Sequence, residues 1–202
     1  QLLKRIIEDD DFEHENWLDI LGEYVERINP SIVGVTAVNV NSNMFKPGYP
    51  FTDILRYLRD IDRSIIIAGG PLATDEYKNF IEKNLCHFVV GKEGENKIQF
   101  LFDSIYEKSS KTLPAPEIYF KHDNVIKQTA GPQDVVDPKG NLINTYNMIE
   151  IEDYNKVGSL NPYSRMVGQD VSFAAFQLNR GCRSRCKFCG VPKLEGDQAN
   201  MP

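Results

Sequence analysis

The stretch IVGVTAVNV, residues Ile32–Val40, is a continuous run rich in β-branched residues. Such a run predicts a strand that is buried on both faces, as the strands of a parallel sheet are. Two later runs have the same character, SIIIAGGP at Ser64–Pro71 and HFVVG at His87–Gly91. We therefore expect three strands of one parallel sheet.

The segments around these runs show the apolar spacing of amphipathic helices. We expect helices over about 14–28 and 51–61, a third that starts near Asp75 with Thr74 as its N-cap, and a fourth within 93–108. In the last, the inward residues should be Ile98, Leu101, Phe102 and Ile105. Strands and helices that alternate in this way predict an open, doubly wound parallel α/β domain of the Rossmann or flavodoxin-like type.

Residues 114–131, PAPEIYFKHDNVIKQTAG, predict a β-hairpin with its turn at His122–Asn124. We expect an α/β domain over 1–109, a linker with this hairpin over 110–170, and a further domain from 171 to 202 that opens with a buried strand. Because the chain starts at Gln1 and stops soon after 190, we expect a fragment of a longer protein.

Ligands of doubly wound domains bind beyond the carboxyl ends of the strands. In this chain those ends carry NVNSN, GGPLAT and GKEGE, three loops rich in Gly, Asn or Thr. Such loops let the backbone approach a ligand closely. We expect them to converge on one site.

Three of the four cysteines lie in NRGCRSRCKFCGVP, Asn179–Pro192. The spacing C-x3-C-x2-C allows three thiolates to face one point. A structural zinc site takes four ligands, and no fourth Cys or nearby His follows in this chain. A four-iron cluster held by three thiolates keeps one iron open for a substrate or cofactor, which suits catalysis. A zinc or redox loop remains the alternative.

The cysteine loop resembles the signature of the radical S-adenosylmethionine (SAM) superfamily, in which an aromatic residue precedes the last cysteine. The resemblance implies that Cys182, Cys186 and Cys189 hold a [4Fe-4S] cluster, and that Phe188 neighbours the adenine of S-adenosylmethionine. It also implies reductive cleavage of S-adenosylmethionine to a 5′-deoxyadenosyl radical. The strand over 171–181 and the loop would then begin a partial (β/α) barrel.

The strings IVGVTAVNV, IIIAGGPLAT and HFVVGKEGE resemble the cobalamin-binding domain found upstream of the radical domain in one branch of that superfamily. The resemblance covers about 14–108, and it implies that one βα unit is missing at the start of this domain. Lys92 stands where the pattern usually has a Glu, and no D-x-H-x-x-G motif is present to place a histidine on cobalt. By this resemblance, the residues that line the corrin and its nucleotide tail are Thr36, Ala37, Val38, Gly69, Gly70, Pro71, Thr74, Gly91, Glu93, Gly94 and Glu95.

Together these resemblances imply part of a cobalamin-dependent radical SAM enzyme, with methyl transfer to an unactivated carbon or a related radical rearrangement as its reaction. No catalytic side chain is assigned. We expect a small-molecule or peptide substrate and an electron donor such as flavodoxin or ferredoxin. The alternatives are a methylthiotransferase-like radical SAM enzyme, or a non-enzymatic module that binds cobalamin or a nucleotide and carries a structural zinc loop.

Composition agrees with a small-molecule partner. The chain has 202 residues, a formal charge of −6 and 41% hydrophobic residues, which allows one sizeable core. An acidic protein offers no basic field for nucleic acid. No apolar run reaches the roughly 20 residues of a membrane helix, and the acidic N-terminus is unlike a signal peptide. We therefore expect a cytoplasmic protein with no nucleic-acid or membrane partner.

Overall fold

The computed structural model describes residues 17–36, 45–106, 114–132, 179–184, 186–191 and 199–200. The chain divides into two compact units. The first, residues 1–27, 138–180 and 199–202, includes most of helix α2 (Trp17–Ile28) and the short antiparallel strands β6 (Asn179–Arg180) and β7 (Ala199–Asn200). The second, residues 28–137 and 181–198, contains the main sheet and the cysteine loop.

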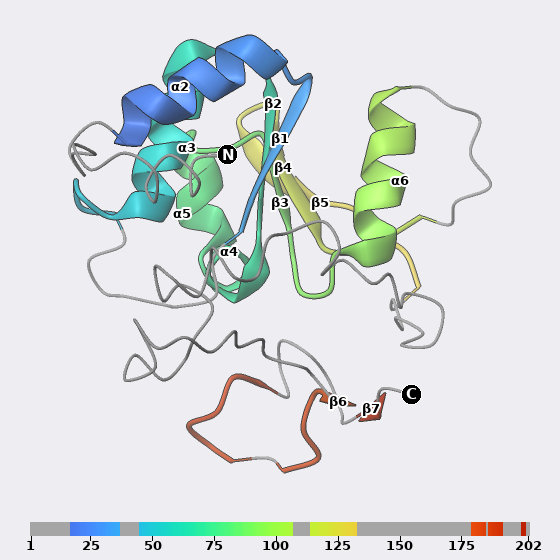
Figure 1. Ribbon diagram of the computed structural model, residues 1–202. Helices are drawn as coiled ribbons and strands as arrows, with labels where there is room; N and C mark the ends of the chain where they lie inside the picture. The colour runs from blue at the N-terminus through green and yellow to red at the C-terminus, as the bar shows by residue number, and fades with distance from the viewer. Residues whose placement is uncertain are drawn as a thin grey trace. The chain divides into compact units, whose positions relative to one another are not determined.

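The main sheet is a mixed sheet of five strands in the order β1-β2-β3-β4-β5 (Figure 1). Its strands are β1 (Ile32–Thr36), β2 (Ile65–Gly69), β3 (Phe88–Val90), β4 (Ile118–His122) and β5 (Val125–Gln128). The first three strands are parallel, as the sequence predicts, and β4 and β5 are antiparallel to their neighbours. Parallel neighbours bring the carboxyl ends of β1, β2 and β3 to one edge of the sheet.

The predicted hairpin is confirmed, and its two strands extend this sheet through β4, which pairs with β3. Asp123 and Asn124 form its turn with φ of 50° and 61°. Two-residue hairpin turns of this hand need positive φ at both positions, and Asp and Asn tolerate it well. The hairpin is thus part of the sheet rather than a free piece of linker. The domain limits at 109 and 170 stay predictions, as does the barrel.

Helices lie on both sides of the sheet (Figure 1). They are α3 (Pro50–Ile61), α4 (Gly70–Asp75), α5 (Tyr77–Glu82) and α6 (Glu95–Ile105). On one side, α6 places Leu101 against Ile67, Val90 and Ile118 in a buried cluster. The inward residues predicted for this helix are confirmed, since Ile98, Phe102 and Ile105 pack around that cluster.

The opposite side of the sheet is covered by α3, α4 and α5, which contact β1 to β4 in turn. Side chains alternate between the two faces of a strand, so Ile66, Ala68 and Val89 point toward these helices. None of the three is accessible to solvent. Phe80 of α5, also fully buried, packs against Phe51 of α3. The sheet therefore separates two apolar layers.

Two local predictions are wrong. The strand β1 is half-buried or exposed along its length, not buried on both faces, because in the described sheet it pairs only with β2. The helix expected from Asp75 begins at Gly70 instead, where a φ of 87° makes a sharp turn that favours glycine. Thr74 is not an N-cap, since its hydroxyl donates to the Gly70 carbonyl 2.9 Å away, inside the helix.

Candidate functional site

A pocket of about 560 Å³ opens at the carboxyl ends of the three parallel strands. Its size is usual for a small-molecule site. Each strand, the turn into α4 and the start of α6 contribute to its wall. The lining residues are Gly34, Val35, Thr36, Ile67, Gly69, Gly70, Val90, Lys92, Glu93, Gly94, Glu95 and Ile98.

The register of the strands shows which side of the sheet carries the pocket. Gly34 lies opposite Ile67, and Gly69 lies opposite Val90. Because side chains alternate, these positions share one face, the face on which α6 packs. Ile98 of α6 completes the wall. The pocket is therefore the space beside α6 at the end of β1 and β2.

Most of the predicted binding positions with described structure meet in this pocket. Those that line it are Thr36, Gly69, Gly70, Glu93, Gly94 and Glu95. Three other predicted residues with described structure do not line the pocket, although each is next to a lining residue in sequence or contacts one. They are Pro71, Thr74 and Gly91. Ala37 and Val38 lie outside the described residues. The structure thus brings the end of β1 and the loops after β2 and β3 to one pocket, while the NVNSN loop lies outside the described residues and the role of each residue stays a prediction.

Small residues leave room for a ligand. A methyl group added at Gly34 would meet no atom within 4 Å, so this strand position is open toward the pocket. The walls that flank it are mostly aliphatic, from Val35, Ile67, Val90 and Ile98. Such a surface suits an apolar or flat part of a ligand, and the charged groups among the described lining residues lie at the loop after β3.

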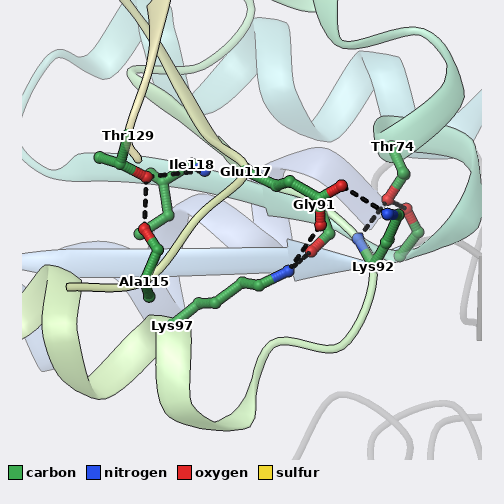
Figure 2. A network of polar contacts seen from close by, with 9 residues as sticks. Thr74, Gly91, Lys92, Lys97, Ala115, Glu117, Ile118 and Thr129 are labelled. Atoms are coloured by element: carbon green, nitrogen blue, oxygen red, sulfur yellow. Dashed lines mark hydrogen bonds and ion pairs between the residues drawn. The ribbon is translucent and has the colours of Figure 1, made fainter. Parts of the chain in front are cut away.

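That loop is held by a network of polar contacts (Figure 2). The ammonium group of Lys97 is 2.7 Å from the Gly91 carbonyl oxygen and 3.2 Å from the Glu117 carboxylate. The other carboxylate oxygen of Glu117 is 2.5 Å from the Lys92 ammonium group. The amide of Gly91 donates to the backbone carbonyl of Glu117 at 2.9 Å. One glutamate from the hairpin thus contacts three residues on or next to the loop.

A second contact fixes the loop to α4. The Lys92 amide donates to the Thr74 hydroxyl at 2.9 Å, and that hydroxyl donates in turn to Gly70. Thr74 therefore connects two of the three strand-end loops. Lys92 has a φ of 55° and Glu117 a φ of 60°, a left-handed conformation that disfavours side chains. Their ion pair and backbone hydrogen bonds hold both in it.

Burial and neighbouring charges shift the pKa of the Glu117 carboxyl in opposite directions. Partial burial raises its pKa, but hydrogen bonds from Lys92 and Lys97, with the charges of both, outweigh that effect, so its pKa lies below the ordinary value of 4.5. The side chain of Lys97 is only 2% exposed. A buried ammonium group requires such a partner, so the carboxylate is ionised at neutral pH.

The cysteine loop has its own local structure. The Cys189 amide donates to the Cys186 carbonyl at 3.1 Å, which closes a tight turn between them. The Ser184 amide donates to the Cys182 sulfur at 3.4 Å. All four cysteines of the chain have free thiols. Phe188 is 94% exposed, an unusual position for a large apolar ring.

The described structure does not bring the three cysteines together. Within the residues it describes, no three Cys, His, Asp or Glu side chains are gathered closely enough to hold a metal ion. The donor set itself, three soft thiols on one short loop, suits an iron–sulfur centre. The assignment of Cys182, Cys186 and Cys189 to a cluster therefore stays a prediction from residue type and spacing.

The fourth cysteine belongs to the core. Cys86 is 3% exposed, and its burial raises the pKa of its thiol to about 12, so it remains protonated. Next to it, His87 accepts the Ile66 amide through Nδ1 and contacts Arg59. Burial, with the charge of Arg59, lowers the pKa of His87. The contact of Arg59 with His87 thus connects α3 to the sheet, and we assign these residues and Cys86 a structural role.

Sequence reasoning missed several site residues. Gly34, Ile67 and Val90 could have been found from the alternation of side chains along each strand. The burial of Lys97 could also have been predicted, because it precedes Leu101 by four residues and so lies on the inward face of its helix. No sequence pattern indicates its partner Glu117, since the contact between Lys97 and Glu117 depends on where the hairpin packs.

Among the helices in the described part of the chain, none is both long enough and apolar enough to cross a membrane.

Comparisons with known proteins agree with this architecture. No family model and no curated protein matches the chain. Its structure is similar to that of TsrM from Kitasatospora setae, a radical SAM methyltransferase solved with cobalamin and a [4Fe-4S] cluster bound, with a TM-score of 0.62 and 16% identity over 100% of this chain and 40% of that one. It is also similar to OxsB, a cobalamin-dependent SAM radical enzyme solved with aqua-cobalamin and S-adenosylmethionine bound. That match has a TM-score of 0.57 and 17% identity, over 91% of this chain and 23% of OxsB.

The chain spans less than half the length of either neighbour. At these identities the similarity shows a shared fold. The structural neighbours of the chain are thus cobalamin-dependent radical SAM proteins.

Proposed function

We propose that the chain is part of a cobalamin-dependent radical SAM enzyme, with the pocket at the ends of β1, β2 and β3 as its cobalamin site. One observation carries the proposal. The end of β1 and the loops after β2 and β3, which resemble parts of cobalamin-binding domains, border a single pocket, in a fold shared with two proteins solved with cobalamin bound. We also propose that the domain is of the doubly wound type, because helices lie on both sides of its parallel strands.

The chemistry of the pocket residues suits contact with part of a corrinoid. The open position at Gly34 and the aliphatic walls can accept an apolar part of the ligand. The backbone of Gly69 and Gly70 can approach polar groups of the ligand, since glycine adds no side chain, and Thr36 adds a hydroxyl to the same wall. Thr74 and Gly91 would act indirectly, because they hold the loop after β3.

On the cysteine loop, Cys182, Cys186 and Cys189 would hold a [4Fe-4S] cluster. When bound, the cluster with S-adenosylmethionine would supply radical chemistry, and cobalamin a transferable methyl group. The chain's own contribution is local: the Ser184 amide orients the Cys182 sulfur through a hydrogen bond, and Phe188 offers an exposed apolar ring for the adenine. We propose methyl transfer to an unactivated carbon, or a related radical rearrangement, on a small-molecule or peptide substrate.

We place the protein in the cytoplasm, where a flavodoxin or ferredoxin can donate the electron. A reducing compartment also keeps the exposed thiols of the loop free for a cluster.

The test uses the intact protein, expressed anaerobically with cobalamin and reconstituted with iron and sulfide. Wild type is compared with the triple variant Cys182→Ala, Cys186→Ala, Cys189→Ala. We expect about four irons and four sulfides per chain in wild type, their loss in the variant, and a corrin absorption band in both. With S-adenosylmethionine and a reductant, only wild type should form 5′-deoxyadenosine. Zinc in place of iron, with no labile sulfide, would refute the proposal.

A further inference from the structure

Two residues that line the pocket have their backbone in a left-handed conformation. Gly70, in the turn into α4, has a φ of 87°, and Lys92, in the loop after β3, has a φ of 55°. Glycine adopts this conformation freely, whereas a residue with a side chain disfavours it. The conformation of Lys92 therefore has to be held by contacts with its neighbours.

The hydroxyl of Thr74 contacts the backbone of both residues. It accepts the Lys92 amide at 2.9 Å (Figure 2), and it donates to the Gly70 carbonyl at 2.9 Å. Thr74 itself is not among the described residues that line the pocket. One side chain outside the lining thus connects two backbone segments that form the wall.

The other contacts of the loop after β3 act at different atoms. The amide and the carbonyl of Gly91 are bonded to Glu117 and Lys97, which fixes the residue before Lys92. The ion pair of Lys92 with Glu117 joins side chains, and the flexible stem of a lysine constrains its own backbone weakly. The Thr74 hydroxyl, in contrast, acts directly on the backbone of Lys92.

The conformation at Lys92 determines where the next residues lie. Glu93, Gly94 and Glu95 follow it and line the pocket, and Gly94 is the residue before α6. A return of Lys92 to negative φ would redirect the chain at these residues. The hydrogen bond from the Lys92 amide lies in an exposed part of the structure, so water can replace the hydroxyl as its acceptor. Loss of the hydroxyl should therefore change the position of the loop more than the stability of the fold.

We infer that Thr74 is a positioning residue: its hydroxyl holds the loop after β3 in the conformation that binds a ligand, before any ligand arrives. The apparent affinity of a ligand falls in proportion to the fraction of protein in the binding conformation. The inference deepens the proposed function and rests on it for its probe, aquacobalamin. The position of the loop is a property of the ligand-free protein and is measurable without that probe.

The experiment compares three variants of the intact protein. Thr74→Val keeps the shape of the side chain and removes the hydroxyl, whereas Thr74→Ser keeps the hydroxyl. Thr129→Val is the matched control, because the Thr129 hydroxyl likewise donates to a carbonyl, that of Ala115 at 2.6 Å, and accepts an amide, that of Ile118 at 3.2 Å (Figure 2). Neither of these bonds involves a residue that lines the pocket, and Ile118 stays paired with Val90 in the sheet.

Hydrogen–deuterium exchange in the ligand-free protein, followed by mass spectrometry, tests the loop directly. Thr74→Val should speed exchange in peptides that cover residues 91–95 by at least about threefold, the effect of one lost hydrogen bond. Thr74→Ser should match wild type there. Thr129→Val should speed exchange in the hairpin, residues 115–129, and leave 91–95 unchanged. Exchange over 91–95 at the wild-type rate in Thr74→Val would overturn the inference.

Equilibrium dialysis with aquacobalamin measures the consequence for binding. The dissociation constant should rise about three- to tenfold in Thr74→Val and stay within about twofold of wild type in Thr74→Ser and Thr129→Val. Equal weakening in Thr74→Val and Thr129→Val would overturn the inference, since it would show a general effect of stability. Unchanged affinity in Thr74→Val, with tight binding by wild type, would also overturn it and leave the proposed function intact.

Two further outcomes are separable. If Thr74→Val does not fold, Thr74→Ala takes its place, with Thr129→Ala as its control and the same expected results. If wild type binds no corrinoid, the cobalamin proposal is refuted, and the exchange measurement alone decides the role of Thr74. Faster exchange over 91–95 in the Thr74 variant but not in the Thr129 variant would then support it, and equal exchange in the two would overturn it.

Discussion

The Glu117 carboxylate lies 3.2 Å from the ammonium group of Lys97, twenty residues away in sequence, and the lysine side chain is almost completely buried. This contact joins the hairpin to α6 underneath the loop that lines the pocket. The same ammonium group holds the Gly91 carbonyl at the end of β3. The docking of the hairpin and the position of the loop at the pocket thus depend on one buried cation.

Lys97→Met should destabilise the protein by about 2 kcal/mol, because the Gly91 carbonyl loses a charged donor in a buried position. Glu117 keeps Lys92 as a partner, so the loss stays moderate. Urea unfolding at pH 7 measures the change. Lys121→Met, at an exposed lysine on β4, is the control and should change the free energy of unfolding by less than about 0.5 kcal/mol. Equal effects in the two variants would contradict the role of Lys97.

The contribution of Glu117 to stability should depend on pH. Its pKa in the folded protein is lowered, so it stabilises the fold above its ordinary pKa of 4.5, and this stabilisation is lost as pH falls through the folded value. The wild type should therefore exceed Glu117→Gln in free energy of unfolding at pH 7, and the gap should narrow on acidification below about 4.5. Denaturant unfolding of both proteins across this range measures the gap. A gap that is constant with pH would be inconsistent with an ionised Glu117.

Gly91→Ala should be destabilising. The added methyl carbon would lie 3.1 Å from the Tyr119 ring and 3.2 Å from the Glu117 carbonyl oxygen. Neither neighbour can move easily, because the ring stacks on Tyr77 at 3.9 Å and the carbonyl is hydrogen-bonded. We expect a loss of about 1–3 kcal/mol in thermal or urea unfolding. Gly34→Ala, where the new methyl group meets nothing within 4 Å, is the matched control and should change little.

The order of strands and helices was predictable because it depends on local periodicity. The run at Ile65–Gly69 is apolar enough to require a buried strand, and the spacing of Leu101 and its neighbours requires a helix face. The pocket was predictable for a similar reason, since the ends of parallel strands share one edge of the sheet.

The features that could not be predicted from the sequence depend on contacts between segments that are distant along the chain. The exposure of β1 follows from its place at the edge of the described sheet, which its apolar composition does not reveal. The start of α4 at Gly70 follows from a backbone turn, and the hydroxyl of Thr74 is used by the loop of another strand. The ion pair of Lys92 with Glu117 could not be predicted from the sequence, because it depends on how the hairpin packs against the loop after β3.

The most direct test of the cobalamin site is binding of aquacobalamin to wild type and to Gly34→Leu, measured by equilibrium dialysis of the intact protein. A Cβ at this position meets no atom within 4 Å, so the leucine side chain should extend into the pocket and the melting temperature should stay close to that of wild type. We expect about one corrin per wild-type chain and affinity at least about tenfold weaker in the variant. Equal binding by the two proteins, or no binding by wild type, would contradict a cobalamin site in this pocket.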